Sequence, residues 1–132
     1  MESTVLVDSC VFITLLKRGL DPALELLKHT DLEDLMTCGM VRMEVLRGLK
    51  IPRIKARLTE FFNVMQNVPT DNRVWETATE TAWKLGRSGI TLPAQDILIA
   101  TCAQRTGAAV LTFDRHFEDI PGLKVYRSID DL

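Results

Sequence analysis

The sequence contains few cysteines and histidines and no long hydrophobic run. Its 132 residues include three cysteines and two histidines, with no CxxC pair. That content is too small for a disulfide framework or a cysteine-rich zinc site, so we expect the cysteines to be reduced, buried thiols. No uncharged apolar stretch approaches the ~20 residues of a membrane-spanning helix, and the N-terminus lacks the pattern of a secretory signal. We therefore expect a cytoplasmic protein without membrane contact.

The chain also lacks the motifs of several large enzyme classes. It has no GxxxxGK[ST], GxGxxG or GxSxG segment, which leaves nucleotide binding and serine hydrolysis without support. Repeats and Gly-, Ser- or Pro-rich linkers are absent as well. With 46% hydrophobic and 26% charged residues, the composition is that of a folded globular protein. We predict one domain over residues 1–132.

The net charge of −2 argues at first against a polyanionic partner. Basic residues are nevertheless concentrated between positions 42 and 57, where six of them stand against one acid, Glu44. The six are Arg42, Arg47, Lys50, Arg53, Lys55 and Arg57. Such a run either follows a phosphate backbone or forms a solvated helical face, and the charge pattern leaves both interpretations open.

Short apolar segments alternate with helical ones along the chain. Strands are predicted at TVLV, LMTC, AAVLT and LKVYR. Helices are predicted between them, over residues 11–19, 21–29, 40–49, 52–63, 72–87 and 93–107. Alternation of this kind indicates a mainly parallel central sheet with helices on both faces, a three-layer α/β/α fold.

Two acids follow predicted strands, at the sheet edge where α/β proteins form their sites. Asp8 comes directly after TVLV, and Asp114 comes just past AAVLT with Thr112 beside it. Each has a purely structural alternative. Asp8 could cap the following helix, and Asp114 could begin the turn DRHFED.

Two further acids lie in predicted helices. Asp96 is in the first turns of a helix with apolar residues around most of its circumference, and a buried carboxylate needs a cation or hydrogen bonds. The helix dipole is the competing explanation, because it also favours an anion at this position. Glu44 falls at the border of a core stripe that includes Val41 and Val45, a position equally compatible with plain surface exposure.

Convergence of these four acids would require a cation, because the carboxylates would otherwise repel one another. A set of oxygen ligands without histidine or cysteine selects a hard ion such as Mg²⁺ or Mn²⁺ rather than zinc. Ions of this kind support hydrolysis of phosphate esters. With the four acids set aside, the net charge of −2 becomes +2, so the acidic total does not exclude RNA as a partner.

The sequence resembles PIN-domain ribonucleases and, among them, the toxin subunits of VapBC toxin–antitoxin pairs. The resemblance rests on VLVDSCVFI, RMEVLRG, LPAQDILIATCAQRTGAAVLTFDRHF and IPGLKV, which span nearly the whole chain in the family's order. It implies that four acids form the catalytic and metal-binding set, namely Asp8, Glu44, Asp96 and Asp114. It also implies hydrogen-bonding support from Ser9 and Thr112.

The resemblance extends to partners. It implies an RNA substrate, a homodimer, and a small antitoxin whose C-terminal segment occupies the groove over the acids. Within that scheme Asp8 and Asp96 are expected as the principal ligands of Mg²⁺ or Mn²⁺, while Glu44 and Asp114 complete the ligand shell or orient water. RNA phosphates are expected along residues 47–57.

Cys10 is a departure from the family, because many relatives have Ser or Asn two residues after the first Asp, and a thiol is a poorer donor. The same residue argues against a haloacid-dehalogenase-type phosphatase, which needs a second Asp at this position. A response-regulator receiver would show paired acids after the first strand and a later lysine, and neither occurs. The remaining alternative is a catalytically silent PIN module that binds RNA or protein. Loss of an acid from the set would favour it, and all four are present.

Overall fold

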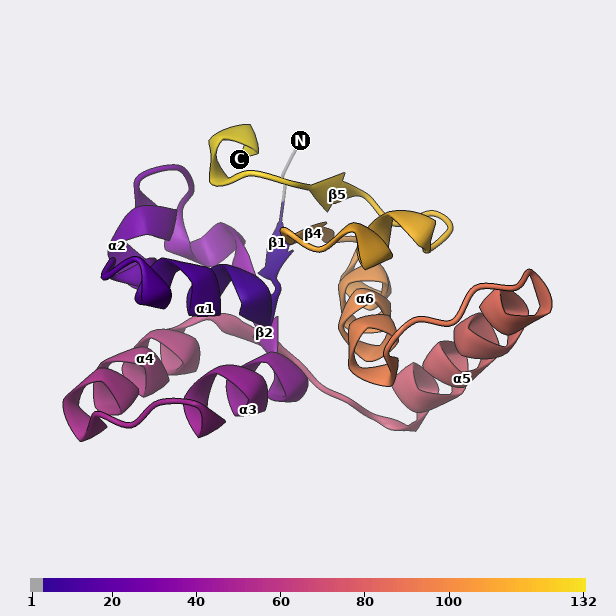
Figure 1. The fold of residues 1–132 in the computed structure, drawn as a ribbon, viewed down its shortest axis with the longest axis horizontal. Coiled ribbons are helices and arrows are strands. Elements are labelled where there is room, and N and C mark those ends of the chain that lie inside the picture. The colour runs from indigo at the N-terminus through magenta and orange to yellow at the C-terminus, as the bar shows by residue number, and fades with distance from the viewer. Residues whose placement is uncertain (1–3) are drawn as a thin grey trace.

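A five-stranded parallel sheet forms the centre of the molecule in the computed structural model, which describes residues 4–132 (Figure 1). The first three residues of the predicted domain lie outside the described range. The strands are β1 (Val5–Val7), β2 (Leu35–Cys38), β3 (Gln66–Val68), β4 (Ala109–Leu111) and β5 (Val125–Tyr126). Their order is β3-β2-β1-β4-β5, and every neighbouring pair is parallel. The predicted parallel sheet is confirmed.

The central strand β1 is paired on both edges. Val5 lies opposite Leu35 of β2 and opposite Ala109 of β4. All residues of β1, β2 and β4 are buried, which explains why these strands are apolar runs, with Thr37 of β2 as the one polar residue, rather than alternating polar and apolar residues.

In the described part of the chain, six α-helices cover the two faces of the sheet, which completes the predicted three-layer fold. They are α1 (Ser9–Lys17), α2 (Pro22–Leu27), α3 (Gly39–Arg47), α4 (Pro52–Val64), α5 (Asn72–Arg87) and α6 (Ala94–Thr106). The chain moves outward from β1 through β2 to β3 and then returns to β4. Because such crossovers are right-handed, the reversal places the later helices on the opposite face. Figure 1 shows α1 to α4 on one side and α5 and α6 on the other.

The helix boundaries follow the start and stop signals of the sequence. The side chain of Asp21 accepts a hydrogen bond of 2.9 Å from the backbone N–H of Ala23 at the start of α2, and Asp71 caps α5 in the same way. At the end of α6, Gly107 adopts a φ of 74°, in the left-handed region that glycine tolerates best.

Strand β3 is not among the strands predicted from the sequence. This strand is QNV, in which only Val68 is buried, so it lacks the apolar run by which strands are recognised. The 3₁₀ helix η2 (Arg115–Asp119), which follows Asp114, was predicted only as a turn. Within residues 4–132, no helix combines the length and the apolar character needed to cross a bilayer.

The crossover pattern places a topological switch point between β1 and β4. The chain leaves β1 towards β2 and leaves β4 in the opposite direction, towards β5. Adjacent parallel strands whose connections diverge in this way open a crevice at their carboxyl ends, where α/β proteins bind ligands. Asp8 directly follows β1 and Thr112 directly follows β4.

Candidate functional site

Asp8 is the most buried acid at this sheet edge, with a relative exposure of 3%. Its Oδ1 accepts a hydrogen bond of 2.8 Å from the backbone N–H of Ser9, so Asp8 does cap α1. Its Oδ2 accepts one of 2.8 Å from the hydroxyl of Thr112 and one of 3.1 Å from the thiol of Cys10. Capping therefore occupies one oxygen, and the other faces the residues of the crevice.

Burial raises the pKa of the Asp8 carboxyl above its usual range. The hydrogen bonds from Cys10, Thr112 and Ser9 oppose this change, and the negative charge of Asp114 adds to it. Hydrogen-bond donors thus stabilise the Asp8 carboxylate, while burial and a neighbouring negative charge oppose its ionisation. A bound cation would supply the missing positive charge.

Ser9 connects Asp8 to Glu44. The Ser9 hydroxyl donates a hydrogen bond of 3.0 Å to Oε1 of Glu44, across the packed helices α1 and α3. Glu44 is half-buried, as its position at the border of the core stripe predicts. Its carboxylate is thereby held beside the start of α1.

Asp114 begins η2 and also faces the crevice. Its backbone N–H donates to the Thr112 hydroxyl at 3.0 Å, so Thr112 connects the chain at Asp114 with the side chain of Asp8. Its Oδ1 accepts 2.9 Å from the backbone N–H of His116. The structural alternative for Asp114 is therefore correct as well, since this side chain does cap the turn.

Asp96 lies in the first turn of α6, with only 13% of its side chain exposed. Burial raises its pKa to about 6. A hydrogen bond from His116 opposes that increase, and the charges of Asp8 and Asp114 reinforce it. Asp96 therefore lies close enough to Asp8 and Asp114 for their negative charges to raise its pKa.

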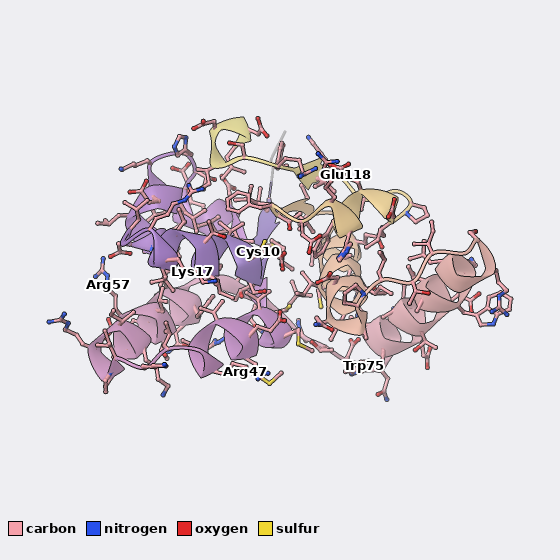
Figure 2. The ribbon with its side chains drawn as sticks, in the orientation of Figure 1. Cys10, Lys17, Arg47, Arg57, Trp75 and Glu118 are labelled. Carbon is pink, nitrogen blue, oxygen red and sulfur yellow. The ribbon has the colours of Figure 1, made fainter. Side chains whose placement is uncertain are left out.

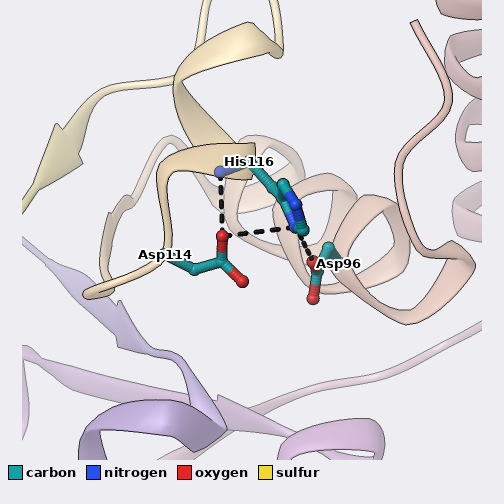
Figure 3. Close-up of side chains that lie close together, drawn as sticks. All are labelled: Asp96, Asp114 and His116. Carbon is teal, nitrogen blue, oxygen red and sulfur yellow. Dashed lines mark hydrogen bonds and ion pairs between the residues drawn. The ribbon is translucent and has the colours of Figure 1, made fainter.

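His116 joins Asp96 to Asp114 (Figure 3). Its Nδ1 lies 3.2 Å from Oδ2 of Asp96 and 3.2 Å from Oδ1 of Asp114. One potential ligand atom from each of the three residues lies within 4.8 Å of the other two. Sequence reasoning expected no histidine here. The only signal was its place two residues after Asp114, in the turn that η2 forms.

The four predicted acids therefore form two bridged pairs, and the structure groups only part of the set closely: within residues 4–132, ligand atoms of Asp96, Asp114 and His116 lie within 4.8 Å of one another, whereas Asp8 and Glu44 lie outside this cluster. Ser9 bridges Asp8 to Glu44, and His116 bridges Asp96 to Asp114. The set consists mainly of carboxylate oxygens, which suits Mg²⁺ or Mn²⁺. A divalent ion fits this donor set because its charge would offset the burial, and secondarily the repulsion between carboxylates, that raise the pKa values of Asp8 and Asp96.

Two of the six basic residues between positions 42 and 57 interact with other side chains. The Arg42 guanidinium donates 2.7 Å to the side-chain oxygen of Asn63 and stacks over the Phe62 ring, while Arg57 forms an ion pair with Asp21. The other four cations are exposed, namely Arg47, Lys50, Arg53 and Lys55. Figure 2 shows Arg47 and Arg57 on the side of the molecule formed by α1 to α4, with Trp75 on the α5 side.

The PIN domain family matches residues 5–123, and the chain belongs to this family. Among curated proteins, no sequence matches the chain significantly. Solved structures with the same fold include VapBC2 from Rickettsia felis bound to a promoter DNA fragment, with 19% identity and a TM-score of 0.75 over 93% of this chain and 97% of that one.

Two further solved structures have the same fold. FitAcB from Neisseria gonorrhoeae has 20% identity and a TM-score of 0.76 over 93% of this chain and 96% of that one. DNA-bound VapBC from Salmonella typhimurium has 21% identity and a TM-score of 0.76 over 94% of this chain and 97% of that one. These likenesses establish a shared fold.

Proposed function

We propose that this protein is a metal-dependent endoribonuclease and the toxin of a VapBC-type toxin–antitoxin pair. The observation that carries the proposal is the arrangement of Asp8, Glu44, Asp96 and Asp114 as two bridged pairs at the switch point of a PIN fold. Membership of the PIN family and the likeness to toxin–antitoxin structures support it.

The four acids have distinct roles in the proposed reaction. Asp8 and Asp96 are the principal ligands of Mg²⁺ or Mn²⁺, since both are largely buried and carry raised pKa values. Glu44 and Asp114 complete the site or accept a hydrogen bond from the attacking water. A bound divalent ion supplies Lewis acidity at the phosphodiester and neutralises charge on the leaving oxygen.

The neighbouring residues position these acids. The Ser9 and Thr112 hydroxyls direct the carboxylates of Glu44 and Asp8. Cys10 takes part despite its weaker donor, because its thiol donates to Asp8 while its sulfur accepts 3.4 Å from the backbone N–H of Phe113. Held in this way, the carboxylates need little reorganisation when substrate arrives.

The RNA path in this proposal uses the exposed cations on the side of α3 and α4. Lys17 is exposed at the end of α1 and lines a hollow that also contains Glu44. The positive charge continues with Arg47 at the end of α3, Lys50 after it and Arg53 in the first turn of α4. A single-stranded phosphate backbone would follow these charges towards the acids.

The antitoxin in this proposal covers the same side. One hollow lies between α1, α2 and α4, beside Leu16, Ile54 and Leu58. A second lies between α1 and α3, where Leu16 and Val45 stand next to Glu44. An apolar peptide segment in these hollows would reach the acids. We further propose a homodimer acting in the cytoplasm.

Cleavage of a labelled single-stranded RNA in the presence of Mg²⁺ or Mn²⁺ tests the activity. Asp8→Asn keeps the side-chain shape but removes a charge, so cleavage should fall by orders of magnitude while the fold persists. Asp31→Asn is the matched control, because Asp31 is exposed and its side chain makes no capping bond. Full cleavage by Asp8→Asn would reject the assigned site. RNA binding by the wild-type protein without metal-dependent cleavage would favour the silent module.

A further inference from the structure

The Nδ1 atom of His116 occupies a position suited to metal binding. It lies 3.2 Å from a carboxylate oxygen of Asp96 and 3.2 Å from one of Asp114 (Figure 3). Neighbouring ligands around an octahedral ion, each about 2.1 Å from it, are about 3.0 Å apart. The two spacings from Nδ1 are thus close to those of neighbouring ligands, and the three potential ligand atoms all lie within 4.8 Å of one another.

The local backbone holds His116 in this orientation. Asp114 caps η2 by accepting 2.9 Å from the backbone N–H of His116, so the turn that carries the imidazole is fixed by one of its carboxylate neighbours. Asp96 approaches from a different element, the first turn of α6. Two separate segments therefore converge on one ring nitrogen.

The ligand preference of each ion determines which ions an imidazole nitrogen would bind more tightly. Mg²⁺ prefers oxygen ligands, whereas an imidazole nitrogen favours first-row transition ions, with affinity rising from Mn²⁺ to Co²⁺. We propose that His116 is a third protein ligand beside Asp96 and Asp114 and that it shifts the selectivity of the site from Mg²⁺ towards transition ions. The inference rests on the metal site of the proposed function.

A different role for His116 predicts a different result. If the ring only positions the two carboxylates by hydrogen bonding, its loss weakens the binding of every divalent ion to a similar extent. If it is a ligand, its loss weakens Co²⁺ and Mn²⁺ binding selectively. The ratio of affinities for two ions, rather than either affinity alone, separates the two roles.

Calorimetric titration of the metal-free protein with Mg²⁺ and with Co²⁺ measures this ratio. His116→Gln should weaken Co²⁺ binding about tenfold or more and change Mg²⁺ binding by less than about threefold. His29→Gln is the matched control, since it removes the other histidine, whose neighbour is Asp130 at 3.9 Å. The visible spectrum of bound Co²⁺ should change in His116→Gln and stay unchanged in His29→Gln.

Each alternative outcome has a definite meaning. Equal weakening for both ions, or no weakening, combined with an unchanged Co²⁺ spectrum would overturn the assignment of His116 as a ligand and leave the metal site intact. If the wild-type protein binds neither ion, or if Asp96→Asn binds both as well as the wild type, the metal site of the proposed function fails instead. Equal melting temperatures for metal-free wild type and His116→Gln would show that the fold is unaffected.

Discussion

The Thr112 hydroxyl donates a hydrogen bond of 2.8 Å to Oδ2 of Asp8, although the two residues are 104 positions apart in the chain. The bond joins the first residue after β4 to the first residue after β1, and both residues are buried. The same hydroxyl accepts from the backbone N–H of Asp114. One side chain therefore connects two of the candidate ligands at the switch point of the sheet.

Replacing Thr112 by valine tests how much this hydrogen bond contributes to the stability of the protein. Valine has nearly the same shape but no hydroxyl, so Asp8 loses its shortest side-chain hydrogen bond and the N–H of Asp114 loses its acceptor. We expect the free energy of unfolding to fall by about 1–3 kcal/mol, the range for buried polar groups left unpaired. Urea unfolding of the metal-free protein measures it.

Thr101→Val is the control for that experiment. Thr101 is also buried, but its hydroxyl donates to the backbone carbonyl of Ile97 within α6. Its loss leaves no carboxylate short of a donor, so the expected change is below about 1 kcal/mol. Equal destabilisation by the two substitutions would show that the hydrogen bond from Thr112 to Asp8 contributes no more to stability than the one from Thr101 within α6.

The metal-free protein should become more stable as the pH falls from 7.5 to 5.5. The pKa of Asp96 is about 6 in the folded protein, above its ordinary value of 3.8. The folded state therefore binds this proton more tightly than the unfolded state, and stability is lost as the pH rises through 6. The raised pKa of Asp8 acts in the same direction.

Urea unfolding at several pH values, for wild type and Asp96→Asn, measures this effect. The variant cannot ionise at position 96, so its stability should depend less on pH and should exceed that of the wild type at pH 7.5. Saturating Mg²⁺ should reverse the trend, because protons then compete with the ion. The prediction would be contradicted if the metal-free wild type became less stable as the pH falls from 7.5 to 6.

Most of the fold was predictable because its signals are local. The bounds of α5 agree with the prediction over 72–87, since Asp71 caps one end and a glycine turn follows the other. The buried strands β1 and β4 are unbroken apolar runs, and β2 is interrupted only by Thr37. By contrast, β3 depends on pairing with β2, as in Asn67 opposite Thr37, and its own residues carry little sign of it.

In the candidate site, too, the features with local sequence signals were predictable and the long-range contacts were not. Acids that follow strands can be placed from sequence, because parallel strands bring their carboxyl ends to one edge. The bridges between them are long-range contacts, such as that of Ser9 with Glu44, and no spacing encodes them. His116 was missed because its role depends on the 3₁₀ geometry of η2, which turns the ring towards a residue of α6.

Divalent ions should raise the melting temperature of the protein. A ligand that binds only the folded state stabilises it by about 2.7 kcal/mol at 100 times its dissociation constant. Thermal unfolding with and without millimolar Mg²⁺ or Mn²⁺ measures the shift. Asp96→Asn should lose most of it and Asp31→Asn should keep it, because only Asp96 lies in the candidate site. No shift with either ion would count against the site.

The exposed cations from the end of α3 to the start of α4 should determine how RNA binding responds to salt. If Arg47 and Arg53 contact phosphates, Arg47→Gln with Arg53→Gln should weaken RNA binding. It should also flatten the plot of log affinity against log salt concentration by about 0.7 per lost contact on a single strand. Stability should change little, because both residues are exposed. The Asp8→Asn background prevents cleavage during the measurement.

Lys84→Gln with Arg87→Gln provides the matched control for the salt experiment. It removes the same amount of positive charge from α5, on the opposite side of the sheet (Figure 1). Lys84 pairs with Glu80 at 4.0 Å, and Arg87 stacks over Trp83. An effect of net charge alone would change both slopes equally, whereas a local phosphate path changes only the first. If neither slope changes, residues 47–57 are a solvated face, and the RNA path is confined to the end of α1, around Lys17.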